Sequence, residues 1–273
     1  VTTNAPTCGN NNGMISANIT GGTNNIQPYL TWFTNVNGDT LNNVLTNNFA
    51  TSIDSLGVGT YSILVEDNHG CIANSTIVLD SGICNPVLNI KAFIQGYYIG
   101  SSLMQTVLLN EGVGTSTTVC DSITVELHSA SAPYALVASQ TRLLHTNGTS
   151  TGSFSQIGSY YIVIKHRNGL QTWSANPVVL SGGIVNYDFT TAANMAYGSN
   201  QTLVSPGVWA IFSGDVTSDE NIDLSDISLV ETDIANFGFG YLPTDINGDG
   251  NVDLNDIPLL EQNISTFIFS NHP

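Results

Sequence analysis

The sequence predicts a mainly β protein that ends in a small α-helical module. Short runs in which apolar and polar residues alternate recur between Gly- and Asn-rich turns over roughly the first 190 residues. Only 9% of the residues are charged, and Asn, Thr, Ser and Gly are abundant, as is typical of β-rich extracellular proteins. After Ser213 closely spaced carboxylates precede apolar residues at helical spacing. We therefore expect two β-sandwich modules, residues 1–84 and 85–205, and a helical module at residues 206–273.

The first module contains strand candidates at residues 14–20, 29–33, 61–67 and 75–80. In the third of these, Tyr61, Ile63 and Val65 alternate with polar or outward-facing positions, which is the pattern of a half-buried strand. The turn residues Asn68-His69-Gly70 separate it from the fourth candidate. A small antiparallel sandwich is predicted.

The same module resembles a known repeat. Gly59-Thr60-Tyr61 followed by Asp67-x-x-Gly70-Cys71 is similar to the SprB-type adhesin repeat of the Bacteroidota, and Cys8-Gly9, Pro28-Tyr29 and Trp32 follow the order of that repeat. The resemblance covers about residues 7 to 80. It implies an Ig-like β-sandwich with a buried Trp32, serving as a surface spacer or adhesive unit without an active site.

The second module has strand candidates at residues 87–99, 104–109, 121–129, 135–144, 159–166 and 176–180. The run Gly158–Lys165, followed by Thr172-Trp173-Ser174, resembles the transthyretin-like sandwiches of secreted proteins, and this resemblance implies a buried Trp173. Residues Tyr187–Thr190 and Ala196–Asn200 are similar to segments of a module found in type IX-secreted Bacteroidota proteins. The two resemblances imply a second β-sandwich and an exported protein.

A calcium loop is predicted at residues 245–256. Oxygen-bearing side chains occupy loop positions 1, 3, 5, 9 and 12, with a backbone carbonyl available at position 7 and Gly250 at position 6. Ca²⁺ prefers six to eight oxygen ligands, which such a loop supplies from alternate residues, and glycine permits the left-handed turn. The expected ligands are Asp245, Asn247, Asp249, Asn251, Asp253 and Asp256.

A second copy of the pattern begins 30 residues earlier. Its expected ligands are Asp215, Thr217, Asp219, Asn221, Asp223 and Asp226. Thr217 stands where Asn or Asp is usual, and Glu220 stands at position 6, where a left-handed conformation costs on the order of 1 kcal/mol for a residue other than glycine. We expect two Ca²⁺ sites, of which the first binds more weakly.

Each loop is followed by apolar residues at helical spacing, namely Ile227, Val230 and Ile234 after the first and Leu254, Ile257, Leu260 and Ile264 after the second. The paired pattern is similar to a type I dockerin, which implies two loop–helix halves with approximate two-fold symmetry and one Ca²⁺ in each. The positions at which such dockerins contact cohesin carry Leu224-Ser225 and Leu254-Asn255 instead of a small hydroxyl pair. We therefore expect a structural role, in which calcium fixes this module to the neighbouring sandwich.

The charge balance excludes nucleic acid as a partner. The chain has 21 Asp and Glu against four Lys and Arg, a formal net charge of −17, whereas a phosphate backbone requires a basic surface. No apolar run approaches the ~20 residues of a transmembrane helix. The five histidines are scattered without an HExxH spacing, and no nucleophile elbow or phosphate-binding glycine loop is present. We expect no enzymatic activity.

The cysteines predict an oxidising compartment. Cys8, Cys71, Cys84 and Cys120 lack the CxxC spacing of zinc and redox sites. Four cysteines allow three connectivities, of which we favour Cys8–Cys71 with Cys84–Cys120. Three Asp-Ser/Thr-aliphatic triplets, at residues 39–41, 54–56 and 121–123, resemble the O-glycosylation site of secreted Bacteroidota proteins.

Together these features predict a structural or adhesive segment near the C-terminus of a large secreted or cell-surface bacterial protein, rigidified by calcium. Its expected partners are neighbouring modules of the same long chain or filament, and a glycan or cell-surface ligand. The alternative is the accessory carbohydrate-binding and dockerin-like region of a secreted polysaccharide-degrading enzyme. That alternative requires some aromatic residues to form a sugar-stacking platform, although aromatic residues in strands more often belong to the core.

Overall fold

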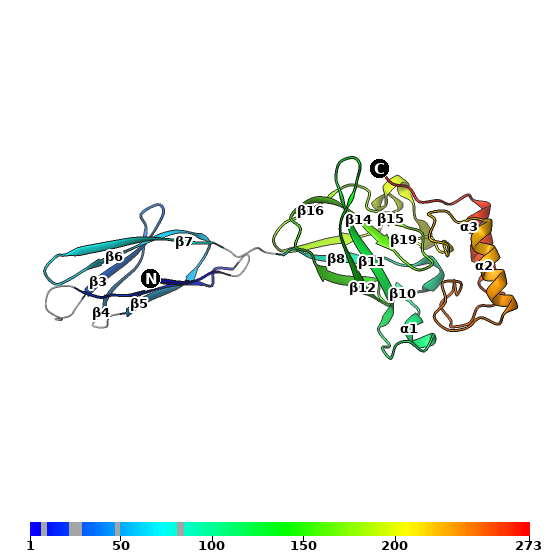
Figure 1. The fold of residues 1–273 in the computed structure, drawn as a ribbon, viewed down its shortest axis with the longest axis horizontal. Helices are drawn as coiled ribbons and strands as arrows, with labels where there is room; N and C mark the ends of the chain where they lie inside the picture. The colour runs from blue at the N-terminus through cyan, green and yellow to red at the C-terminus, as the bar shows by residue number, and fades with distance from the viewer. Residues whose placement is uncertain (7–9, 22–28, 47–49, 81–84) are drawn as a thin grey trace. The chain divides into compact units, whose positions relative to one another are not determined.

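The computed structural model describes residues 1–6, 10–21, 29–46, 50–80 and 85–273. The chain forms two compact units, Val1–Cys84 and Asn85–Pro273 (Figure 1). The predicted boundary between residues 205 and 206 lies inside the second unit, so the predicted second sandwich and the helical segment share one compact body.

The described residues of the first unit form seven strands in two antiparallel sheets. The strands are β1 Thr2–Asn4, β2 Gly13–Asn18, β3 Tyr29–Asn35, β4 Thr40–Thr46, β5 Ala50–Leu56, β6 Gly59–Glu66 and β7 Ile72–Leu79. One sheet has the order β1-β2-β5 and the other the order β4-β3-β6-β7. The core between them contains Ile15, Ala17, Phe33, Leu56, Tyr61, Ile63, Ile77 and Leu79. This unit has the predicted sandwich-like architecture.

All four strands predicted in this unit are present, as β2, β3, β6 and β7. Tyr61 and Ile63 are buried and Val65 packs against the same core, as the alternation predicts. Strands β4 and β5 were not predicted, because their residues, Thr40–Thr46 and Ala50–Leu56, are mostly polar and lack a regular apolar alternation.

The β-rich part of the second unit is built on two larger sheets that share one core. Its strands are β8 Val87–Lys91, β9 Tyr98–Gly100, β10 Leu103–Met104, β11 Val119–Ser129, β12 Leu136–His145, β13 Thr149–Ser153, β14 Gly158–Lys165, β15 Thr172–Trp173, β16 Val178–Leu180, β17 Ile184–Asp188, β18 Thr202–Ser205 and β19 Val208–Ala210. Short 3-10 turns form at η1 Gln95–Tyr97, η2 Ala193–Met195 and η3 Tyr197–Ser199.

One sheet has the order β12-β11-β14-β15, with β16 also paired to β14, and the other has the order β13-β8-β17. The β17–β8 pair is parallel, and the other pairs are antiparallel. Apolar residues of β8, β11 and β14 meet between the two sheets, among them Ile90, Val125 and Ile162. The mainly β, sandwich-like fold is therefore confirmed in both units.

The predicted strand at residues 104–109 is wrong over most of its length. Only Leu103–Met104 is strand, and Val107–Asn110 forms the one-turn helix α1. Val107 is buried in the core, whereas Leu109 is exposed. The single helical turn therefore directs Val107 into the core and Leu109 toward the solvent. Apolar periodicity does not distinguish a strand from a helix in so short a run.

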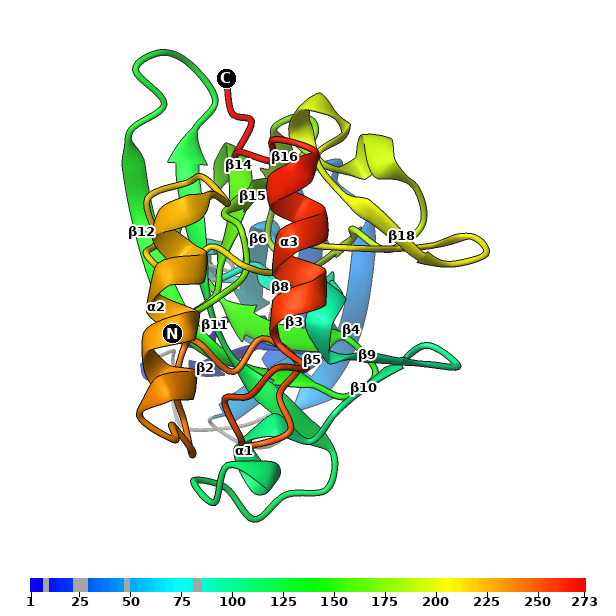
Figure 2. The ribbon, with the colours of Figure 1, turned by 90° about the vertical axis from the view of Figure 1, so that its right-hand side faces the viewer.

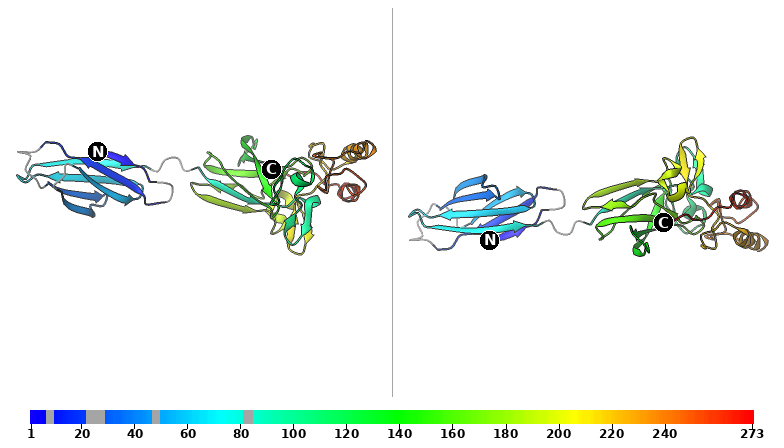
Figure 3. Two further views of the ribbon diagram at one scale, coloured as in Figure 1. Left: turned by 90° about the horizontal axis from the view of Figure 1, so that it is seen from below. Right: turned by 90° about the horizontal axis from the view of Figure 1, so that it is seen from above.

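Two longer helices form in the C-terminal segment, α2 Leu224–Ala235 and α3 Ile257–Ser265, and they lie side by side (Figure 2). Figure 3 shows them beside the sheets of the second unit. Val230 and Leu260 are buried, as predicted, but Leu254 is exposed because α3 begins three residues after it. No helix in the described ranges has the length and apolar character needed to cross a membrane.

The expected Cys84–Cys120 disulfide is not formed. Cys120 is a free thiol, completely buried in the core of the second unit, where its Sγ lies 4.0 Å from Sδ of Met104. Cys71 is also a free thiol, on the surface. Cys8 and Cys84 lie outside the described residues. Burial in an apolar core suits Cys120 as a small hydrophobic side chain.

Candidate metal centre

The last residue of the second loop joins the two ends of that loop. Asp256 is completely buried, and its Oδ1 accepts hydrogen bonds from the backbone N–H groups of Ile246, at 2.7 Å, and Asn247, at 3.1 Å. Its Oδ2 accepts from the N–H of Asp253, at 2.9 Å. One side chain at position 12 therefore holds residues at positions 2, 3 and 9 of the loop.

The first residue of the loop organises its middle. Asp245 is also completely buried, and its two carboxylate oxygens accept from the N–H groups of Gly248 and Gly250, each at 2.8 Å. The side-chain oxygens of Asn247 and Asp249 accept from the N–H groups two residues further on, at 2.8 and 2.9 Å. The loop therefore turns alternate side chains onto its own backbone.

The first loop repeats this arrangement. Asp226 accepts from the N–H groups of Val216, Thr217 and Asp223 at 2.9, 3.0 and 2.9 Å. Asp215 accepts from the N–H groups of Asp219 and Glu220 at 3.1 and 3.2 Å. The aspartate at position 12 therefore makes the same three bonds in both loops, whereas the aspartate at position 1 accepts from positions 5 and 6 here instead of 4 and 6.

The two loops differ at positions 4 and 6, where both require left-handed backbone. The second loop has Gly248 and Gly250 there, with φ of 74° and 94°. The first loop has Ser218 and Glu220, with φ of 57° and 73°. Glu220 therefore adopts the strained conformation predicted from its place in the pattern, and Ser218 adds a second strained residue.

Each loop is closed by the segment that follows the opposite helix. The N–H of Ile222 donates to the carbonyl of Ile268 at 2.9 Å, and the N–H of Val252 donates to the carbonyl of Gly238 at 2.9 Å. Isolated antiparallel bridges join Asn221 to Phe269 and Phe239 to Asn251 in the same places. The two loop–helix halves are therefore interlocked, and they share a core that contains Val216, Ile222, Val230, Ile246, Val252 and Leu260.

The buried carboxylates of both loops lie in an unfavourable electrostatic environment. Burial raises the pKa of Asp215 and of Asp256 to about 6, and it also raises the pKa of Asp245. In the described part of the chain no Lys, Arg or His forms a salt bridge with Asp215, Asp226 or Asp256. Buried negative charge without a cation is costly, and an oxygen-bound Ca²⁺ would compensate for it.

All twelve predicted ligands lie in these two loops, and their donor types and burial fit Ca²⁺. Asp215, Asp226, Asp245 and Asp256 are buried, whereas Asn221 and Asn251 lie at the exposed rims. The carboxylate oxygens are turned toward the N–H groups of their own loops. Among the described residues no group of three His, Cys, Asp or Glu side chains is arranged to hold one metal ion. Ligation would thus require these side chains to reorient toward the loop centre.

The second loop is pressed against η1 and α1 of the sandwich. A Cβ on Gly248 would lie 2.6 Å from Cγ2 of Val107, and a Cβ on Gly96 would lie 2.0 Å from the carbonyl oxygen of Ile246. The side-chain amide of Asn110 donates to the carbonyl of Gly248 at 2.9 Å. These contacts leave no space for a side chain at either glycine and fix the loop to the sandwich.

A buried ionic cluster, which sequence reasoning missed, lies behind this loop. Arg167 donates to Glu111 at 2.5 Å, to Asp121 at 3.1 Å and to the carbonyl of Leu242, and its guanidinium lies 4.2 Å from the ring centre of Tyr241. Arg167, Glu111 and Asp121 come from the β-rich part, whereas residues 241 and 242 precede the second loop. The arginine therefore connects the two parts of the unit.

For both Glu111 and Asp121, burial raises the pKa and the positive charge of Arg167 lowers it. Burial raises the pKa of Glu111 to about 8 despite the nearby Arg167, and the negative charge of Asp245 acts in the same direction as burial. Burial alone would raise the pKa of Asp121, but hydrogen bonds and charge from His166 and Arg167 hold it well below its usual range. Oε2 of Glu111 is buried and has no hydrogen-bond partner among the described residues.

No protein-family model matches the sequence, and no curated protein matches it. Chains of two type II cohesin–X–dockerin complexes from Acetivibrio cellulolyticus are similar in structure. One, from an N-terminal interface mutant, is 16% identical over 65% of this chain and 95% of that chain, with a TM-score of 0.38. The other, from a C-terminal interface mutant, is 18% identical over 66% and 95%, with a TM-score of 0.39.

The major pilin subunit BcpA of Bacillus cereus is similar at 10% identity over 59% of each chain, with a TM-score of 0.24. At TM-scores this low the likeness supports no conclusion about what this chain binds.

Proposed function

We propose that this chain is a non-enzymatic structural or adhesive segment of a larger secreted or cell-surface bacterial protein, and that residues 206–273 form a dockerin-like calcium module. The observation that carries the proposal is the pair of interlocked loops with buried carboxylates that lack cations. The second loop is also pressed into the sandwich, so calcium bound there would stiffen the whole second unit.

Calcium would act by binding the folded loops in preference to the unfolded chain. Such binding stabilises a protein by RT ln(1 + [Ca²⁺]/Kd), about 2.7 kcal/mol at a hundredfold excess over Kd. The ion in the second loop would be held by Asp245, Asn247, Asp249, Asn251, Asp253 and Asp256, and the ion in the first by Asp215, Thr217, Asp219, Asn221, Asp223 and Asp226. The loops would position these oxygen atoms for Ca²⁺ and would disfavour cations that need a smaller and more regular shell of ligands.

The test is calorimetric titration of the full chain with Ca²⁺, together with thermal unfolding in calcium and in chelator. We expect two binding events of unequal affinity and a higher Tm in calcium. Asp245→Ala/Asp249→Ala should remove the tighter event and leave the weaker one. The matched control is Glu231→Ala/Glu261→Ala, which removes two charges from the exposed faces of α2 and α3 without touching either loop.

Absence of binding by the unmodified chain, together with equal Tm in calcium and chelator, would reject the calcium part of the proposal. Equal loss of binding in the loop variant and the control would show that bulk negative charge, and not the loop, attracts the ion.

A further inference from the structure

The outward face of the sheet β4-β3-β6-β7 carries a row of side chains centred on Trp32. The strand register places Trp32 of β3 opposite Leu64 of β6, and Leu64 opposite Asn74 of β7. Trp32 is only half-buried, which corrects the expectation of a core tryptophan, because residues at even positions of β3 face away from the core that contains Phe33. Trp173, by contrast, is buried as expected.

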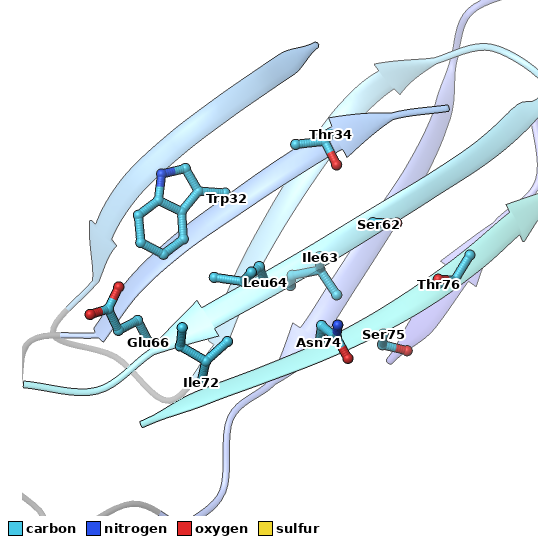
Figure 4. A pocket seen from close by; sticks show the side chains of 10 residues that line it. All are labelled: Trp32, Thr34, Ser62, Ile63, Leu64, Glu66, Ile72, Asn74, Ser75 and Thr76. Atoms are coloured by element: carbon cyan, nitrogen blue, oxygen red, sulfur yellow. The ribbon is translucent and has the colours of Figure 1, made fainter. Parts of the chain in front are cut away.

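Polar residues flank this row on both sides. Thr34, Ser62 and Thr76 form the next row in register, and Glu66 lies opposite Ile72 in the preceding one. Figure 4 shows Glu66 and Ile72 toward one end of the face and Thr34 and Thr76 toward the other, with Trp32 and Leu64 between them. These residues line an open groove of about 430 Å³, within the usual size range of small-molecule sites.

The polar groups of the groove are available to a ligand. The side chains of Glu66, Asn74, Thr34 and Thr76 form no hydrogen bond or ion pair with any described residue. A half-exposed indole between unpaired amide, carboxylate and hydroxyl groups offers an apolar surface with hydrogen-bonding groups at its edges. A pyranose ring has the complementary arrangement, with C–H groups on its faces and hydroxyls around its rim.

The negative charge of the first unit favours a ligand without negative charge. All four basic residues of the chain, Lys91, Arg142, Lys165 and Arg167, belong to the second unit, whereas the first unit has five carboxylates. An anionic glycan would therefore meet repulsion with no compensating cation. A second copy of the same unit is opposed for the same reason, because it brings another net negative surface to the face.

We propose that this face of the first unit binds a neutral polysaccharide, with a sugar ring stacked on Trp32 and its hydroxyls bonded by Glu66 and Asn74. The inference rests on the adhesive part of the proposed function and supplies its ligand class. It does not depend on calcium.

The test is retention of the full chain in affinity electrophoresis on neutral polysaccharides, namely α- and β-linked glucans, mannan, galactan and chitin, with alginate and polygalacturonate as anionic comparisons. We expect retention by at least one neutral polymer and by neither anionic one. Trp32→Ala should weaken that retention at least tenfold, and Asn74→Ala should weaken it several-fold without disturbing the core.

Asn68→Ala is the matched control, because Asn68 is an exposed asparagine in the β6–β7 turn and is not part of the groove. Unfolding curves of each variant identify loss of fold as a cause. The proposal is overturned if no neutral polymer retains the chain, or if Trp32→Ala binds as well as the unmodified chain. It is also overturned if the chain self-associates through this face and Trp32→Ala abolishes that association.

The two proposals fail separately. Loss of calcium binding in Asp245→Ala/Asp249→Ala should leave polysaccharide retention unchanged, and Trp32→Ala should leave the calcium titration unchanged.

Discussion

Position 6 of each loop shows how one residue determines the backbone strain of a turn. Gly250 adopts φ of 94° without strain, whereas Glu220 adopts φ of 73° with a side chain. The backbone strain at Glu220 is partly offset, because its Oε1 accepts a hydrogen bond from the side-chain amide of Gln171 at 3.2 Å. Ser218, at position 4 of the same loop, has left-handed backbone and forms no such bond among the described residues.

Ser218→Gly is therefore expected to stabilise the second unit by about 1 kcal/mol, because glycine adopts this backbone without a Cβ clash. Gly250→Ala should destabilise it by more than that, since a Cβ there would lie 2.8 Å from the carbonyl oxygen of Asn110. Urea unfolding in chelator measures both. A destabilised Ser218→Gly variant would show that the serine contributes more than its backbone conformation indicates.

The residue scale also shows what the sequence could predict. The twelve loop residues could be predicted as ligands because their spacing is local and repeated. Trp32 was expected in the core from family resemblance, although its even register with Leu30 and Thr34 places it outside. Arg167 and Glu111 gave no signal, because they are 56 residues apart and meet only through the fold.

At the scale of elements, the second loop contacts η1 and α1, and Arg167 adds a further connection between the β-rich part and the segment before that loop. It donates hydrogen bonds to Glu111 and Asp121 in the β-rich part and to the carbonyl of Leu242 before the loop. The side chains of Glu111 and Asp121 are completely buried. Neither acid could be solvated if the arginine were removed.

Arg167→Met is expected to destabilise the second unit by about 3–5 kcal/mol, because it removes the cationic partner of buried Glu111 and one of the partners of buried Asp121, which keeps His166. Lys165→Met is the control, since Lys165 is an exposed partner of Glu126 and its loss should cost no more than about 1 kcal/mol. Denaturant unfolding in a Trp32→Phe background, where Trp173 and Trp209 report on the second unit alone, compares the two. Equal effects of the two substitutions would contradict a connecting role for Arg167.

The elements themselves were predictable to the extent that their patterns were regular. Long alternating runs gave β6, β11 and β14, and apolar residues at helical spacing gave α2 and α3. Helix α1 was missed because four residues are too few for periodicity to decide. The boundary at residue 205 was drawn where composition changes, but packing joins the segments on either side of it.

For the whole molecule, the unpaired buried carboxylates determine the response to pH. In the metal-free protein the pKa of Asp215 and of Asp256 lies at about 6, above the value of about 4 for an aspartate in an unfolded chain. Between these values the folded state binds more protons than the unfolded state, so the free energy of unfolding falls as pH rises from about 4 to about 6.

In chelator, Tm is therefore expected to fall as the pH is raised from about 4 to about 7, whereas in saturating calcium the ionised carboxylates are compensated and Tm should rise over the same range. Asp256→Asn should weaken the dependence in chelator, because the amide does not titrate while Asp215 still does. Thermal scans across this range measure all three. A Tm in chelator that is independent of pH would exclude this role for the buried aspartates.

The interlocking of the two halves sets an order of assembly. The first loop is closed by residues 268 and 269, and Ser270 donates its N–H to the carbonyl of Glu220. As the polypeptide emerges from the ribosome, the loop at residues 215–226 stays open until the chain is free beyond residue 270. The site that is earlier in the sequence is thus completed last, and cleavage after α3 would undo it from more than 40 residues away.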